Sequence, residues 1–201
     1  MSPQPTSRLR LQGEVHHITL RGRDGQALFL APADRATLDG LVGDVLRTFR
    51  ARAHAYCWMT NHLHLVAEVA PARANPLAIE LADRYSAAWS GEAAARSPLF
   101  ALPQPPFRVH ADAYLLQLIR YVHLNPVRGG LARDAADYPW SGHRTYLGYG
   151  GPAWLSTDLG LRLLGGDLLR AVAAYRVFVA PIGTPHHREA LVDCRFYPGR
   201  Y

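Results

Sequence analysis

Two histidines separated by a single leucine, His62 and His64, are the residues whose type and spacing point most directly to chemistry. They lie in a segment that alternates as a β-strand does, so both side chains are predicted on one face, with Cα atoms ~7 Å apart. Imidazoles placed in this way can bind one divalent metal ion. The same spacing also fits two structural histidines whose ring nitrogens form hydrogen bonds within the fold. The pair alone therefore does not decide between metal ligands and structural residues.

A tyrosine and an asparagine form the second candidate group. Tyr121 and Asn125 stand at positions i and i+4 of a helical pattern, which places a phenol and an amide on one helix face. An ordinary phenol has a pKa of ~10, so its attack at neutral pH needs a metal ion or a cation nearby. Tyr114 competes for the role of nucleophile, but its i+4 neighbour is apolar. The structural alternatives are that Tyr121 packs against a sheet and that Asn125 caps the helix before Pro126.

An amide oxygen beside two imidazoles sets which metal the site would take. This donor set suits Mg²⁺ or Mn²⁺ better than structural zinc, which usually has thiolate ligands. The candidate metal ligands are therefore His62, His64 and Asn125, and the candidate catalytic residue is Tyr121. A bound ion would polarise a phosphoryl oxygen and lower the cost of the phenolate.

The composition favours an anionic partner. The chain has 201 residues and a formal charge of +6, and all 22 basic residues are arginine. Arginine suits bidentate phosphate contacts, but a genome rich in Arg and Ala codons accounts better for the missing lysine. Cys57 and Cys194 form no spacing motif, which fits a reducing cytoplasm, with Cys57 as a small core residue. We find no signal peptide and no apolar run long enough to span a membrane.

Periodicity predicts an α+β fold. Alternation favours strands over residues 14–21, 52–59, 62–69 and 107–109, and 3.6-residue spacing favours helices over 32–50, 75–90, 113–124, 158–164 and 166–178. We expect Asn75 and Asp112 to cap their helices, with Pro76 at the first helical position, and Asn125-Pro126 to end the third helix. The order predicts a ferredoxin-like antiparallel sheet with helices stacked on one side.

The remaining segments are predicted to connect or cover these elements. Residues 91–106 form a proline-rich loop, and residues 137–141 form a turn. Tyr138, Trp140 and Tyr146 are interpreted as packing residues that cover the third helix, and His123 within that helix is interpreted as a structural residue. The length predicts one domain over residues 1–180, followed by an irregular tail over 181–201.

Four segments of this chain resemble the REP-associated tyrosine transposases, which are similar to the single-tyrosine HUH transposases of short bacterial insertion sequences. The resemblance runs from about Gly13 to Gly165. It is carried by VHHITLRGR (15–23), AYCWMTNHLHLV (55–66), YLLQLIRYVHLNPVR (114–128) and DYPWS (137–141).

The resemblance implies an HUH nuclease fold and a metal-dependent enzyme that nicks and transfers single-stranded DNA. His62, His64 and Asn125 match the residues that hold Mg²⁺ or Mn²⁺ in the family, and Tyr121 matches the nucleophile that forms a 5′-phosphotyrosine and frees a 3′-hydroxyl. The expected partner is hairpin DNA, such as a repetitive extragenic palindrome. The expected setting is the bacterial cytoplasm, associated with the nucleoid, for a monomer or homodimer.

Five arginines are the predicted DNA contacts: Arg21, Arg23, Arg108, Arg120 and Arg128. Arginines at a helix end are also common without a ligand. One segment departs from the family pattern, because Pro103-Gln-Pro-Pro-Phe-Arg-Val109 replaces a more basic stretch before the third helix. This departure leaves open a hairpin-binding regulator that has lost turnover. A phosphodiesterase that uses water, with Tyr121 only packing, is the third hypothesis.

Overall fold

The sheet has the four strands that the sequence predicts. The computed structural model describes residues 13–89, 98–109 and 112–180, so the predicted tail over 181–201 and part of the 91–106 loop lie outside the described residues. The strands are β1 (Glu14–Arg21), β2 (Arg52–Trp58), β3 (His62–Val69) and β4 (Phe107–Arg108). They pair antiparallel in the order β2-β3-β1-β4.

Two long helices complete the predicted ferredoxin-like unit. Helix α1 (Pro32–Phe49) connects β1 to β2, and α2 (Pro71–Ala88) connects β3 to β4. The chain order β1-α1-β2-β3-α2-β4 with this strand order is the split βαβ arrangement, so the predicted fold class is confirmed. Ile18, Leu20 and Leu65 pack from the sheet into the apolar core beneath α1 and α2.

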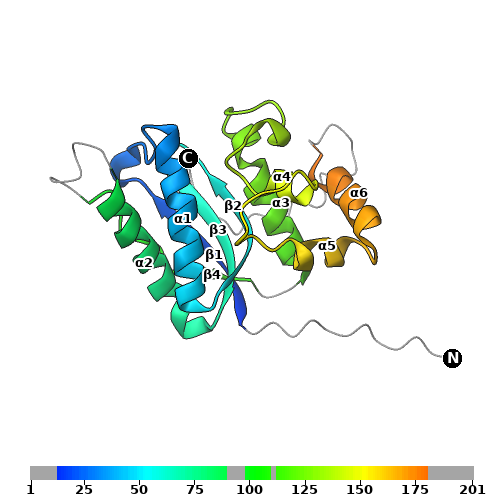
Figure 1. Ribbon diagram of the computed structural model, residues 1–201, viewed down its shortest axis with the longest axis horizontal. Helices are drawn as coiled ribbons and strands as arrows, with labels where there is room; N and C mark the ends of the chain where they lie inside the picture. The colour runs from blue at the N-terminus through cyan, green and yellow to red at the C-terminus, as the bar shows by residue number, and fades with distance from the viewer. Residues whose placement is uncertain (1–12, 90–97, 110–111, 181–201) are drawn as a thin grey trace.

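The prediction that the helices stack on one side of the sheet is wrong. Four further helices lie on the side of the sheet opposite α1 and α2 (Figure 1). They are α3 (Asp112–Arg128), α4 (His143–Tyr146), α5 (Asp158–Leu164) and α6 (Leu168–Val179). Val15, Cys57 and Val66 pack from this second face into a separate core with α3, α5 and α6. Every residue of β3 is buried, because both faces of the strand are covered.

Two predicted helix boundaries also need correction. Helix α2 begins at Pro71, so Asn75 is not its cap and Pro76 lies inside it. Proline fits the first helical position because its missing N–H has no partner there in any case. Helix α3 continues through Asn125 and Pro126 to Arg128. Asn125 and Pro126 are buried, so packing offsets the one helical hydrogen bond that the proline ring removes.

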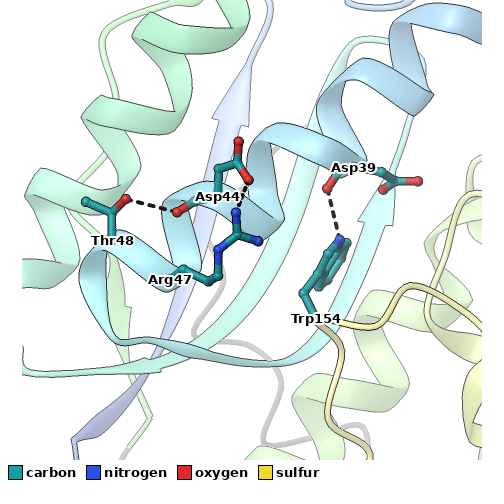
Figure 2. Close-up of polar contacts among 5 residues, drawn as sticks. All are labelled: Asp39, Asp44, Arg47, Thr48 and Trp154. Carbon is teal, nitrogen blue, oxygen red and sulfur yellow. Dashed lines mark hydrogen bonds and ion pairs between the residues drawn. The ribbon is translucent and has the colours of Figure 1, made fainter.

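The chain beyond α4 returns across the edge of the sheet to α1. The Trp154 indole N–H donates to the Asp39 carbonyl oxygen at 2.9 Å, as Figure 2 shows, and the Trp58 indole donates to the Asp39 carboxylate at 2.7 Å. Leu155 pairs with Ala53 of β2 as an isolated bridge. Asp39 therefore joins α1, the sheet and the segment that follows α4.

The aromatic residues predicted to pack around α3 do so. The hydroxyl of Tyr138 donates to the Trp58 carbonyl oxygen at 2.6 Å, and that of Tyr146 donates to the His54 carbonyl oxygen at 2.9 Å. His123 is fully buried against the Tyr175 hydroxyl, and Cys57 is fully buried. Within the described residues, no helix is both long and apolar enough to cross a membrane.

Candidate functional site

The register between β1 and β3 collects polar side chains on the face that α3 covers. Arg21 pairs with His62 and Thr19 pairs with His64, so these four side chains share one face of the sheet. His17 lies two residues before Thr19 on the same face of β1. Strand alternation thus brings a third histidine beside the predicted pair.

Tyr121 of α3 lies over this group of histidines. Its ring is half-buried, with its centroid 5.7 Å from the His64 ring and 6.3 Å from the His17 ring, both in edge contacts. The His62 and His64 rings lie 4.9 Å apart. The phenol from the helix and the imidazoles from the sheet therefore lie together, as the sequence hypothesis requires.

The hydrogen bond between His64 and His17 bears on which His64 nitrogen is available. His64 Nδ1 lies 2.9 Å from His17 Nε2, and the Thr19 hydroxyl lies 3.4 Å from each of these two nitrogens. His64 Nε2 is buried and has no hydrogen-bond partner among the described residues. A buried N–H without a partner is rare, so the favoured arrangement has His64 donating through Nδ1 and keeping a lone pair on Nε2.

A similar contact orients His62. Its Nδ1 lies 2.8 Å from the Asn61 side-chain oxygen, which can only accept, so Nδ1 carries the proton and Nε2 keeps a lone pair. Asn125 donates its side-chain N–H to the Tyr121 carbonyl oxygen at 2.9 Å. Its side-chain oxygen is therefore the atom that could coordinate a metal ion. His62 and Asn125 line one cavity of about 290 Å³.

Burial keeps the three imidazoles neutral. Loss of hydration, with a smaller contribution from the Arg21 charge, lowers the pKa of His17 to about 3 and that of His62 to about 4. Burial also holds the pKa of His64 well below its ordinary value, and His17, His62 and Arg21 act in the same direction. Neutral imidazole is the form that binds metal ions.

These side chains supply nitrogen and oxygen atoms of the types that bind divalent ions. The described residues contain no cluster of three His, Cys, Asp or Glu side chains arranged to hold a metal, so a site here would need the Asn125 amide beside two histidines. The unpartnered Nε2 of His64 and the matching tautomer of His62 supply two nitrogen donors. Two imidazoles and an amide oxygen together would make a mixed nitrogen and oxygen ligand set.

Three of the five predicted DNA-contact arginines are exposed near this face. Arg21 ends β1 opposite His62, and Arg23 begins the short helix η1 (Arg23–Gly25), whose Gly25 lines the cavity. The Arg128 guanidinium lies over the Tyr121 ring, 5.2 Å from its centroid. These three guanidinium groups place positive charge around the site.

The other two arginines have partners elsewhere in the fold. Arg120 is buried and donates to the carbonyl oxygens of Phe178 and Ala180, at 2.7 and 3.4 Å, so it holds the end of α6 and does not offer a DNA contact. Arg108 forms a 2.6 Å ion pair with Glu14. This ion pair reduces the positive charge that the unusual 103–109 segment presents.

Sequence reasoning missed His17 and Thr19 as members of the site. The alternation of β1 already predicted that both side chains share one face. It did not show which strand would pair beside them. Sequence reasoning also assigned no role to Asn61, whose side chain orients His62. The signal that could have found His17 was its face of β1, combined with the register of β1 against β3, which the sequence does not give.

Comparisons with known proteins support the fold. No protein-family model matches this chain, and no curated protein matches it. A solved structure described as a REP-associated tyrosine transposase bound to a REP hairpin superposes with a TM-score of 0.60 at 16% sequence identity. The match covers 78% of this chain and 92% of that one. The chain therefore has the fold of that transposase.

Proposed function

We propose that this protein, which has the fold of a REP-associated tyrosine transposase, is a metal-dependent enzyme that nicks and transfers single-stranded DNA. The observation that carries this proposal is the contact of the Tyr121 ring with His64, beside a cavity lined by His62 and Asn125. A nucleophile and metal-binding groups in one place are what phosphoryl transfer needs. The proposed domain comprises residues 1–180.

The reaction exchanges one phosphodiester for another. The Tyr121 phenol oxygen attacks phosphorus, the bond from phosphorus to the 3′ oxygen breaks, and a 5′-phosphotyrosine forms. The leaving 3′ oxygen takes up one proton while the phenol loses one, so no oxidant or energy source is needed. Attack by the freed 3′-hydroxyl of another strand reverses the step and completes strand transfer.

The residues of this chain have separate tasks in that reaction. His62, His64 and Asn125 would hold Mg²⁺ or Mn²⁺, which when bound polarises the phosphoryl oxygen and stabilises the charge of the transition state. Arg128, over the Tyr121 ring, favours the phenolate by its charge. Arg21, Arg23 and Arg128 contact the DNA phosphates.

The proposed substrate is a hairpin with single-stranded arms, because the structural neighbour is described as bound to a REP hairpin. A test incubates the protein with such a hairpin and Mn²⁺ and resolves the products by denaturing electrophoresis. We expect a slower-migrating band of DNA linked to protein. Hairpin binding without a linked band would instead support a regulator, and cleavage without a linked band would support attack by water.

The regulator is the second candidate function, and the ion pair between Arg108 and Glu14 favours it. Strand β4 is only two residues long, and its exposed arginine is paired with a carboxylate. A weakened DNA-contact strand would slow turnover while the rest of the fold still binds a hairpin.

His17 is proposed as a positioning residue for His64. Replacing His17 with phenylalanine removes the acceptor of the His64 Nδ1 proton, so we expect Mn²⁺ affinity to fall about 10- to 100-fold. His17→Gln keeps an acceptor and should recover most of the affinity. Titration of Mn²⁺, followed by the electron paramagnetic resonance of the free ion, measures both. Equal affinity in both variants, with unchanged melting temperatures, would contradict the role.

Substitutions of Arg128 and Arg120 are expected to change different properties, DNA binding for Arg128 and stability for Arg120. Arg128→Ala should lower the slope of log affinity for hairpin DNA against log salt by about one, because one phosphate contact is lost. Arg120→Met should leave that slope unchanged but lower the free energy of unfolding by about 2 kcal/mol, since carbonyl oxygens at the end of α6 lose a charged donor. Salt-dependent binding and urea unfolding of both variants check this pair. A salt slope lowered by Arg120→Met would restore Arg120 to the DNA surface.

A further inference from the structure

The cavity beside the candidate metal ligands extends well past them. Its volume is about 290 Å³, and besides His62 and Asn125 it is lined by three segments that are distant in sequence. These are the chain just after β1, the connection between β2 and β3, and the chain just after α3. None of the roles proposed above uses most of this lining.

The lining combines apolar walls with a polar rim. Ala27, Met59 and Leu131 supply the apolar surface, and the Leu131 side chain remains 45% exposed at the mouth. Gly129 lets the chain after α3 lie close to Met59, because a Cβ atom there would lie only 3.0 Å from the end of the Met59 side chain. A flat ligand with apolar faces fits such walls better than a charged one does.

Thr60 and Asn61 supply the polar groups at the rim. Both residues are exposed and their backbone carbonyl oxygens already accept from Leu28 and Gly22, at 2.9 and 2.8 Å. The Asn61 side-chain oxygen is used by His62, which leaves the amide NH₂ as a donor. The Thr60 hydroxyl can donate or accept. The rim therefore offers a few directional hydrogen bonds around an apolar space.

We propose that this cavity receives the base of one unpaired nucleotide next to the scissile phosphate. A phosphate held beside His62 and Asn125 fixes the position of the adjoining nucleotides, and an unpaired base there has exposed faces and polar edges to bury. Walls for its faces and donors for its edge lie directly alongside. The assignment rests on the proposed function and adds where, and by which residues, the substrate is read.

The experiment measures binding of hairpin DNA whose single-stranded arms carry an abasic site at each position in turn, with a chelator present so that nothing is cleaved. In the wild-type protein, one abasic position should weaken binding by about tenfold. Ala27→Leu fills the cavity with an aliphatic side chain that cannot stack on a base. This variant should bind intact DNA about tenfold more weakly and show no further loss at that abasic position, because the two changes remove the same contact.

Two further variants keep the test decisive. Ala173→Leu makes the same change at an exposed position of α6, away from the cavity, and should keep the full abasic effect. Leu131→Ala opens the wall without filling it and should reduce the abasic effect in a protein whose circular dichroism matches the wild type. Losses that simply add in Ala27→Leu, or an abasic effect unchanged in both cavity variants, would overturn the base site while leaving the proposed function standing. Absence of any hairpin binding would overturn both.

Discussion

Replacing Tyr121 with phenylalanine is expected to eliminate the protein-linked DNA band and to lower strand cleavage by at least about a thousandfold. The substitution removes one oxygen and keeps the ring, so the edge contacts with His64 and His17 should persist. Hairpin affinity should change by less than about twofold, because binding comes from arginines and exposed bases. Denaturing electrophoresis and a filter-binding assay on the same preparation measure the two effects.

Tyr114→Phe is the matched control, since Tyr114 lies on the same helix and its ring packs 6.0 Å from that of Phe107. It should keep the linked band at nearly the wild-type level. Cleavage that survives in Tyr121→Phe would show that water attacks and that Tyr121 only packs. A linked band lost in Tyr114→Phe alone would instead move the nucleophile seven residues along α3.

The second large effect is expected for His64→Ala. The change removes the buried Nε2 that has no partner among the described residues, and with it one of the two proposed nitrogen ligands. Cleavage should fall below detection and Mn²⁺ affinity should fall steeply, while hairpin binding in a chelator stays largely intact. His62→Ala should have the same effect, because its Nε2 is the other proposed ligand atom.

His16→Ala provides the control for the histidine substitutions. His16 is also a buried strand histidine, but it lies on the opposite face of β1 from His17. It should keep cleavage and Mn²⁺ binding, apart from any loss of stability. Equal loss of binding and cleavage in His64→Ala, with an unchanged circular dichroism spectrum, would contradict the metal role.

The structure also separates the five arginines that the sequence predicts as DNA contacts. The sequence offered five arginines of equal standing, but folding buries Arg120 under α6 and pairs Arg108 with Glu14. Arg21, Arg23 and Arg128 remain as exposed guanidinium groups near the site. The proposed phosphate contacts are therefore these three arginines.

Local periodicity was enough to predict most elements and two parts of the site. The alternation around His62 and His64 and the i+4 spacing of Tyr121 and Asn125 follow from the geometry of a single strand and a single helix, which depends on neighbouring residues alone. Local patterns did not predict the end of α3, since Pro126 lies within this helix only because its last turn is buried.

The sequence by itself determined which side chains share a face: the paired histidines on one strand, and the phenol and the amide on one helix. Only the tertiary structure decided that α3 covers the histidine face of the sheet and that His17 meets His64, a residue 47 positions away. It also decided that Arg120 donates hydrogen bonds to carbonyl oxygens at the end of α6. The physical reason is that strand register and helix packing are set by contacts between distant segments, whose total burial depends on the whole core and on no local pattern.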